Sequence, residues 1–493
     1  MTFHPSIKKP HKADWQRIIN RTKNQEPRTK TYHYRLIRRH ILVFAPGSLL
    51  LTQTKNMKVM KFGGTSVGTP QRMKDVVKLI TDGEQNLVVL SAMSGTTNSL
   101  IEISDYLYKQ NLEGALTCIN KLQDKYLGHI AELYSTDEYK VLTTKVVGEI
   151  FDRIRSCAKT DFTSREERII VAQGEMLSTN MVTNYLLEQG HNVQLLPALD
   201  FMRTNADKEP DLKYIKEHAE AILNANAGKE LYITQGFICL NVDGEVDNLQ
   251  RGGSDYTASL LGAAIGASEI QIWTDIDGMH NNDPRFVENT TPVSHLHFVE
   301  AAELAYFGAK ILHPTCIQPA QYANIPVRLL NTMDPTAPGT TISNITEHRK
   351  IKAVAAKDNI IAINITSTRM LLAYGFLRRV FEVFEKYKTS IDMICTSEVG
   401  VSMSIDDRTN LIPILNELKK FGVVEVDDNM CIICVVGDLD WRNVGFESIA
   451  AQALKDIPVR MISYGGSNHN ISFLISASDK QRALQSLSSH LFE

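Results

Sequence analysis

The sequence predicts an α/β protein in which a mostly parallel sheet, covered by helices on both faces, is followed by two small repeated units. From Met57 to about residue 345, short apolar strand patterns alternate with helical patterns, and small and polar residues gather where the strands end. After residue 352 the same βαββαβ order of elements occurs twice. The chain has 493 residues, enough for about two to four domains, and no apolar run long enough to predict a membrane span.

Residues 1–56 differ in composition from the rest of the chain. They contain 12 Lys and Arg but only 2 Asp and Glu, whereas the whole chain has a formal net charge of −3. An apolar run appears only after about 40 residues, which argues against a secretory signal peptide. A transit peptide fits the excess of Arg, but a true start at Met57 fits better because a well-formed strand begins there. We expect this basic leader to be disordered or not part of the native protein.

The first folded region is predicted over residues 57–345. It opens with a buried strand at 57–62, a Gly-rich turn, and a helix with Pro70 at its start and Gly83 after its end. Parallel sheets bind ligands on the loops at the carboxyl ends of their strands, so we expect the site there. Further strands are predicted at 87–93, 193–198, 231–237, 271–275 and 325–330.

The two repeated units are placed at residues 352–428 and 429–493. Each opens its first helix with Gly-Phe, at Gly375-Phe376 and at Gly445-Phe446. Such paired units commonly form a ligand site at their shared interface.

The seven cysteines have no regular spacing, which favours reduced thiols and a cytoplasmic location. Cys431 and Cys434 form a CxxC, but the residues between them are apolar and β-prone. We therefore predict a buried strand there and not a metal knuckle or a redox pair.

A Lys-x-Gly-Gly turn follows the first strand. Gly63 and Gly64 let backbone N–H groups face an anion, the helix starting near Pro70 adds a positive dipole end, and Lys61 supplies a full charge for phosphate. The same turn could instead serve only the fold. It is not a P-loop, because the chain contains no GxxxxGK[ST] pattern.

A second Gly-rich segment, Arg251-Gly252-Gly253-Ser254-Asp255, opens a predicted helix. Arg251 can hold a carboxylate in a bidentate fork, and the backbone of the three residues that follow presents N–H donors to an anion. Asp255 could order a lysine ammonium or a metal-bound phosphate, although it could also be only a helix cap. The density of special residues favours a functional site.

Two further segments supply candidate nucleotide contacts. Thr274 and Asp275 end a strand and Arg285 follows them, but this is also an ordinary Asx-rich turn. Lys310 could add a second cation for a transferred phosphate, or it could be a helix-end lysine favoured by the dipole. Cations, anion cradles and acids without a Ser-His or Cys-His grouping indicate phosphoryl transfer, and Arg251 indicates an amino or organic acid as acceptor.

These motifs together resemble the aspartate kinases, in which an amino-acid kinase fold is followed by two ACT domains. The resemblance covers Met57 to Glu493 and is carried by KFGGTSV at Lys61–Val67, QGE at Gln173–Glu175, MRTN at Met202–Asn205, QGF at Gln235–Phe237, RGGSDYTA at Arg251–Ala258, WTDIDG at Trp273–Gly278 and FGAKILHP at Phe307–Pro314. It implies transfer of the ATP γ-phosphoryl group to the β-carboxylate of L-aspartate, the first step of lysine, threonine and methionine biosynthesis. It implies Mg²⁺ carried with ATP, and no separate metal ligands.

The resemblance also assigns roles to residues of this sequence. Lys61, Asp255 and Lys310 are the expected catalytic residues, and His280 stands where related enzymes have a Tyr. The expected ATP-binding residues are Lys61, Gly63, Gly64, Ser91, Thr274, Asp275, His280, Arg285, Lys310 and Ile311. The expected aspartate-binding residues are Thr97, Glu175, Phe237, Arg251, Gly252, Gly253 and Ser254, with Arg251 on the α-carboxylate and Glu175 on the ammonium group.

The repeated units resemble the ACT domains of the monofunctional, lysine-sensitive branch of this family. The resemblance implies feedback inhibition by lysine and a homodimer formed through the ACT domains, with no nucleic acid or membrane partner. Asp392 and Glu398 would receive the effector's side-chain ammonium, whereas Ala373 replaces a Ser of that branch. The expected effector residues are Met370, Ala373, Phe376, Leu377, Ser390, Ile391, Asp392, Ser397 and Glu398.

Two other functions fit parts of the sequence. A kinase of the same fold could act on acetylglutamate, glutamate or a nucleotide, but such enzymes usually lack the ACT pair. A non-catalytic amino-acid sensor would be expected to have lost Lys61, Arg251 or Asp255, and all three are present. The sequence therefore favours the aspartate kinase.

Overall fold

The computed structural model describes residues 57–158, 161–249, 252–308, 312–368, 370 and 374–492. The chain divides into two compact units, Met1–Gln53 and Thr54–Glu493, and only the second contains described residues. The predicted leader therefore lies outside the described residues, as do Arg251, Lys310, Ile311 and Ala373.

The first region is built on an eight-stranded sheet with the strand order β3-β4-β2-β1-β7-β9-β10-β8. Neighbouring strands are parallel throughout, except that β9 and β10 are antiparallel. The mostly parallel sheet predicted from the sequence is thereby confirmed. The strands are β1 (Lys58–Phe62), β2 (Asn86–Leu90), β3 (Val193–Leu196), β4 (Leu231–Gln235), β7 (Glu269–Thr274), β8 (His295–His297), β9 (Val327–Asn331) and β10 (Thr340–Ser343), beside a separate hairpin of β5 (Ile238–Leu240) and β6 (Val246–Asn248).

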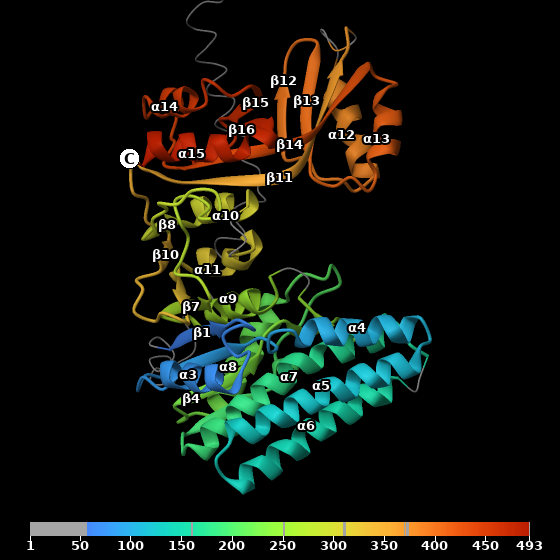
Figure 1. Cartoon of the computed structure of the whole chain (residues 1–493), viewed down its shortest axis with the longest axis vertical. Helices are drawn as coiled ribbons and strands as arrows, with labels where there is room; N and C mark the ends of the chain where they lie inside the picture. Colours follow the sequence, from blue (N-terminus) through green and yellow to red (C-terminus); the bar gives the residue numbers. More distant parts are fainter. Residues whose placement is uncertain are drawn as a thin grey trace, which may run out of the picture. The chain divides into compact units, whose positions relative to one another are not determined.

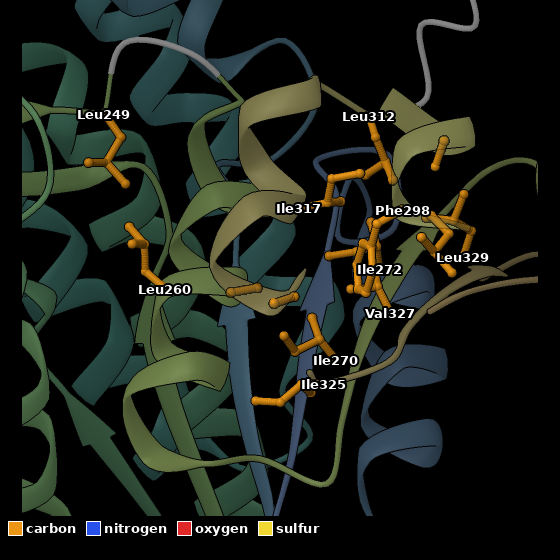
Figure 2. Close-up of a cluster of buried hydrophobic side chains, with 14 of the residues drawn as sticks. Leu249, Leu260, Ile270, Ile272, Phe298, Leu312, Ile317, Ile325, Val327 and Leu329 are labelled. Atoms are coloured by element: carbon orange, nitrogen blue, oxygen red, sulfur yellow. The ribbon is translucent and has the colours of Figure 1, made fainter. Parts of the chain in front are cut away.

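Helices cover both faces of this sheet. Along β1, Val59 belongs to one buried hydrophobic cluster, while Met60 and Phe62 belong to another, so alternate side chains enter two cores. Figure 2 shows part of the first core, where side chains from β7 and β9 meet those from the helices. Helices α8 (Leu212–Ala225), α9 (Gly253–Ile265), α10 (Phe298–Tyr306) and α11 (Gln318–Ala323) contribute to the first core, and α3 (Pro70–Ile80), α4 (Thr96–Tyr108), α5 (Leu112–Leu133), α6 (Asp137–Cys157) and α7 (Ser164–Glu188) to the second.

The expected alternation of strands and helices fails between β2 and β3. Four long helices, α4 to α7, follow one another there and lie side by side (Figure 1). Helices α4, α5 and α6 each have one buried side, α7 is buried around most of its circumference, and together they close a core around Tyr126, Phe151 and Met181. The apolar spacing of the segment therefore encodes helix-on-helix packing and not a strand crossover. Among the described residues, no helix is long and apolar enough to span a membrane.

The second region contains a six-stranded antiparallel sheet with the order β12-β13-β11-β14-β16-β15. Its two central strands are unusually long, and they pair with each other along most of their length. The strands are β11 (Ile351–Thr366), β12 (Met393–Thr396), β13 (Gly400–Ile405), β14 (Val423–Gly437), β15 (Val459–Tyr464) and β16 (Asn470–Ser476); the helices are α12 (Phe376–Lys386), α13 (Leu411–Leu418), α14 (Phe446–Ala453) and α15 (Lys480–Leu491).

This sheet carries two separate cores, as expected for two repeated units. Ile363, in the second half of β11, packs with α12 and α13, whereas Val354, in its first half, packs with α14 and α15. The first half of β11 thus completes the second unit. Residues 423–427 and 431–438 were predicted as two strands, but the structure joins them in β14, where Cys431 and Cys434 are buried as predicted. The domain limits at 345, 352, 428 and 429 stay predictions.

Candidate active site

The Lys61 side chain forms an ion pair with Asp255. Lys61 is the residue before the last one of β1, and Asp255 lies in the first turn of α9. The carboxyl end of the strand and the N-terminus of the helix therefore meet at this pair. The Lys61 Nζ and Asp255 Oδ1 atoms are 2.7 Å apart, and both side chains are largely shielded from solvent. The carboxylate therefore fixes the position of the ammonium group, where a phosphate oxygen can meet both this charge and the helix dipole.

The two Gly-rich turns bring backbone close to backbone. A Cβ on Gly64 would lie 2.7 Å from the carbonyl oxygen of Ala92. At Gly252, where φ is +70°, a Cβ would lie 1.7 Å from the Cys316 sulfur. Both positions therefore require glycine. The close approach brings the turn that follows β1 and the start of α9 next to the cavity described below.

Seven of the predicted site residues line one cavity of about 340 Å³. The rest of its lining comes from residues 91–98, the segment that joins β2 to α4 together with the first three residues of α4, which we call the substrate loop. Ser91 of this loop donates a hydrogen bond to the Ser254 hydroxyl at 2.9 Å, tying the loop to the start of α9. The seven residues are Gly64, Ser91, Thr97, Glu175, Phe237, Gly253 and Ser254.

Glu175 is the only carboxylate in the lining of this cavity, and it is 5% exposed. Burial raises the pKa of Glu175 to about 7, although the N–H of Ala92, which donates to Oε1 at 3.2 Å, lowers it. One backbone donor does not offset the desolvation cost of a buried carboxylate charge. The Glu175 carboxylate is therefore suited to a cationic group of a ligand, such as an ammonium.

Phe237 has a backbone conformation that is rare for its residue type. Its φ is +67°, and its N–H donates to the Thr257 hydroxyl at 2.9 Å. Phe237 lines the cavity beside the start of α9, where a Cβ on Gly253 would lie 3.3 Å from the Phe237 ring. Non-glycine residues with positive φ are enriched at binding sites, and QGF carries such a residue.

Two of the predicted ATP-binding residues line a different cavity. His280 and Arg285 line a second cavity, of about 490 Å³. The His280 ring is held by Asp277 at 2.8 Å and by Thr290 at 2.8 Å, while Arg285 is paired with Asp283 and is mostly exposed. Thr274 and Asp275 lie directly before this loop, and Gly63 donates to the carbonyl of Trp273 at 3.2 Å. Their roles stay predictions, and Lys310 and Ile311 fall outside the described residues.

Sequence reasoning missed the far wall of the second cavity. Val354, Ala355 and Ala356 of β11 line it, and a Cβ on Gly308 would lie 2.2 Å from the carbonyl oxygen of Ala356. Strand β11 of the second region therefore packs against the cavity that contains His280 and Arg285. No sequence motif predicts this contact, because the residues of β11 that make it are small, apolar and distant in sequence from His280.

The described effector residues lie between β11 and α12, at the start of α12, and on both sides of β12. Phe376 is buried in the core, with Met370, Leu377 and Ile391 packed against that core. Ser390, Ser397 and Glu398 are exposed.

Asp392 is the one predicted effector residue with charged partners among the described residues. Its side chain is fully shielded, and Oδ1 meets the Lys357 Nζ at 2.7 Å and the Tyr306 hydroxyl at 2.5 Å. Oδ2 is buried without a hydrogen-bond partner among the residues described. Burial and the neighbouring carboxylate raise the pKa of Tyr306 to about 12, so its hydroxyl stays protonated and donates. Neither partner of Asp392 was predicted.

No group of three or more His, Cys, Asp or Glu side chains among the described residues could hold a metal ion. The candidate site therefore offers cations, backbone donors and two carboxylates with separate partners. Such a set can bind a phosphate-bearing ligand beside an ammonium-bearing one.

The chain matches known proteins over most of its length. Residues 56–331 match the amino acid kinase family, and residues 433–491 match an ACT domain. Lysine-sensitive aspartokinase 3 of Escherichia coli is 34% identical, with 88% of this chain and 99% of that protein covered. The chain belongs to the aspartokinase family. Chloroplastic aspartokinase 3 of Arabidopsis thaliana is also 34% identical, with 90% of this chain and 83% of that protein covered.

The structural comparison agrees with this family. The crystal structure of E. coli aspartokinase III in complex with aspartate and ADP has a TM-score of 0.76 and 32% identity, and it covers 89% of this chain and 100% of that one. The structure of the same enzyme with lysine and aspartate has a TM-score of 0.74 and 34% identity, with 89% and 100% covered. The predicted fold class, an amino-acid kinase fold followed by ACT domains, is confirmed, and so is the assignment as a kinase.

Proposed function

We propose that this chain transfers the γ-phosphoryl group of MgATP to the β-carboxylate of L-aspartate. A β-carboxylate oxygen forms a bond to the γ-phosphorus, the bond to the oxygen bridging the β- and γ-phosphorus breaks, and 4-phospho-L-aspartate and ADP result. The acceptor is already ionised at neutral pH, so the reaction needs no general base. The single observation that carries the proposal is the Lys61–Asp255 ion pair beside the cavity that contains Glu175.

The chain's own residues bind and position the two reactants. The Lys61 ammonium, held by Asp255, meets the phosphate oxygens where negative charge concentrates in the transition state. The Glu175 carboxylate meets the ammonium group of aspartate and fixes which end of the substrate faces the phosphate. Arg251, outside the described residues, is proposed for the α-carboxylate. Asp255 is the residue that would face Mg²⁺ carried with ATP, and the ion would supply neutralisation of part of the phosphate charge.

The test of this proposal is an acceptor panel. The full chain is supplied with MgATP and hydroxylamine, which converts an acyl phosphate to a hydroxamate. We expect hydroxamate with L-aspartate and none with L-glutamate or N-acetylglutamate. Product with glutamate or acetylglutamate, but not with aspartate, would replace aspartate as the substrate while leaving the kinase chemistry in place.

We further propose that lysine inhibits the enzyme by binding at Asp392. The Lys357 ammonium now occupies Oδ1 of this carboxylate, and although burial opposes it, the hydrogen bonds to Asp392 and Asp406 hold the pKa of Lys357 above its ordinary value. An effector lysine carries the same chemical group, so it competes with Lys357 for the carboxylate or takes the unpartnered Oδ2. Lysine sensitivity of the E. coli relative supports this choice of effector.

The Asp392 site is joined to the nucleotide side by short contacts. Lys357 follows Ala356, which packs on Gly308 and lines the 490 Å³ cavity. Tyr306, the other partner of Asp392, is the last residue of α10 and lies two residues before Gly308. An effector that displaces Lys357 would therefore shift both walls of that cavity. In this proposal, lysine bound at Asp392 inhibits the reaction by changing the binding of ATP.

A homodimer formed through the ACT domains and a cytoplasmic location complete the proposal. Light scattering on the full chain should give twice the monomer mass of 55.3 kDa. A monomer at micromolar concentration would reject the dimer, and recovery of the protein in an organelle fraction of its source cells would reject the location.

A further inference from the structure

The substrate loop supplies seven of the twelve residues that line the 340 Å³ cavity. Thr96 is the exception among residues 91–98, because its side chain turns away from the cavity and is fully buried. Its hydroxyl lies 2.8 Å from the hydroxyl of Tyr126 on α5. The end of the loop is therefore anchored on the helix behind it.

Three helices hold this loop at different points. Glu175 and Ser178 of α7 hold its start, since Glu175 accepts from the Ala92 N–H and the Ser178 hydroxyl donates to the Ser91 carbonyl. At the other end, Gly95 caps α4 with φ at +80° and without a side-chain hydrogen bond to the cap. Among the described residues, the buried side-chain anchor at this end is Tyr126 of α5.

The Tyr126 ring is itself fixed. It is fully buried and packs edge-on against Phe151 at a centroid distance of 6.0 Å. Burial raises the pKa of Tyr126 far above the physiological range, despite the hydrogen bond from Thr96, and the charge of Glu175 raises it further. The hydroxyl is thus always protonated, and it lies near the one carboxylate of the cavity. The adjacent Lys125 adds an exposed hydrogen bond to the Ser94 carbonyl at 3.2 Å.

We propose that Tyr126 is a positioning residue for the acceptor amino acid. Its hydroxyl holds Thr96 and thereby sets the conformation of residues 94–97 before the substrate arrives. A loop that is already ordered loses less conformational entropy on binding, so the anchor increases affinity for the acceptor without touching it. The inference rests on the proposed function, because it takes aspartate as the ligand of this cavity.

The test compares two buried tyrosines of the same helical core. Tyr126→Phe removes the anchor hydroxyl. Tyr134→Phe is the matched control, because Tyr134 follows the last residue of α5, is 3% exposed and donates to the Met181 carbonyl at 2.6 Å, away from the substrate loop. Both variants remove a buried, hydrogen-bonded hydroxyl, so both should lose some thermal stability.

We expect Tyr126→Phe to raise the KM for aspartate about fivefold to tenfold and to change the KM for ATP less than about twofold. Tyr134→Phe should change neither KM. Thr96→Val, which removes the other partner, should reproduce the effect, and the double variant should be no worse than either single one. The wild-type enzyme is assayed first. If it has no activity with aspartate, the proposed function is rejected, whereas the role of Tyr126 is judged only from the variants of an active wild type.

Equal KM changes for both substrates, or equal effects of the two tyrosine variants, would reduce Tyr126 to a structural residue and overturn the inference. If Tyr126→Phe proves too unstable to assay, Thr96→Val provides the same comparison. An additive double variant would also contradict the anchor, because it would show that the two hydroxyls act independently.

Discussion

The two carboxylates proposed to receive an amino-acid ammonium differ in what already occupies them. Glu175 faces an open cavity with a single backbone donor, whereas Oδ1 of Asp392 is held by Lys357 and by Tyr306. The substrate carboxylate is therefore ready to bind, and the effector carboxylate must first exchange one partner. A substrate site can use a buried carboxylate that has few partners and is free to bind an ammonium group. A regulatory site can instead use a carboxylate that is already paired, so that the effector and the internal ammonium compete and the protein has two states.

The largest expected effect comes from the phosphate end of the substrate site. Lys61→Met should lower kcat about 10³-fold, because the positive charge that meets the transferred phosphoryl group is lost. Lys58→Met is the matched control on the same strand, where Lys58 pairs with Glu84 instead, and it should keep kcat within about twofold. Steady-state rates at saturating aspartate and ATP measure both. Near-normal turnover in Lys61→Met would remove this residue from the catalytic step.

The second effect is a pH dependence of aspartate binding. Because the pKa of Glu175 is about 7, the charged form falls about tenfold between pH 8 and pH 6, and the KM for aspartate should rise by that factor. Glu175→Gln should have a high KM at both values. Glu188→Gln, at the far end of the same helix, should keep the wild-type profile, because Glu188 accepts hydrogen bonds from Ser135 and Thr136 and its pKa is lowered. A wild-type KM that does not change with pH would contradict this role of Glu175.

The regulatory side gives the next effect. Lys357→Met removes the internal competitor, so the lysine concentration for half-inhibition should fall about fivefold, and the KM for ATP without lysine should rise because the variant already lacks the Lys357–Asp392 contact. Lys350→Met is the control, since Lys350 is exposed and pairs with Glu347. Rates over a range of lysine concentrations measure the shift. A weaker response to lysine in Lys357→Met would show that Lys357 supports the effector instead of competing with it.

The smallest effect concerns stability. The folded-state pKa of Glu175 lies above its ordinary value, so the protein takes up a proton on folding between pH 4.5 and about 7, and the cost of the buried charge is fully present above pH 7. Glu175→Gln should therefore raise Tm by about 1 to 3 °C at pH 8 and by less at pH 5. Calorimetry at the two values measures the difference. A lower Tm at pH 8 would mean that the carboxylate stabilises the empty site.

Local patterns in the sequence predicted β1, β2, β3, β4, β7 and β9 and the glycine turns, whereas Thr97, Glu175 and Phe237 followed only from the family resemblance. Each of these strands and turns depends on near neighbours, such as the apolar period of β1 or the close approach that Gly64 requires. Local sequence patterns could not predict the side chains that contact Asp392. Lys357 is 35 residues away and meets Asp392 only because strands pair across the sheet, and Tyr306 comes from another region. Neither pairing leaves a period or a motif in the sequence.

The long central strands show the same limit. The two strands predicted at 423–427 and 431–438 are separated by residues 428–430, and Asp428 and Asn429 are residue types that favour turns. In the structure Asn429 has φ at +55°, but β14 continues because β11 pairs with it on both sides of that residue. Tertiary pairing overrides the local turn preference.

The central claim is that a phosphoryl group passes from ATP to aspartate at the Lys61–Asp255 pair. Phosphorus NMR of the full chain with MgATP and aspartate tests it most directly, because an acyl phosphate has its own resonance. The account predicts that this resonance grows together with ADP, disappears on addition of hydroxylamine, and is absent in Lys61→Met but present in Lys58→Met. Formation of only ADP and inorganic phosphate, at the same rate with and without aspartate, would contradict it.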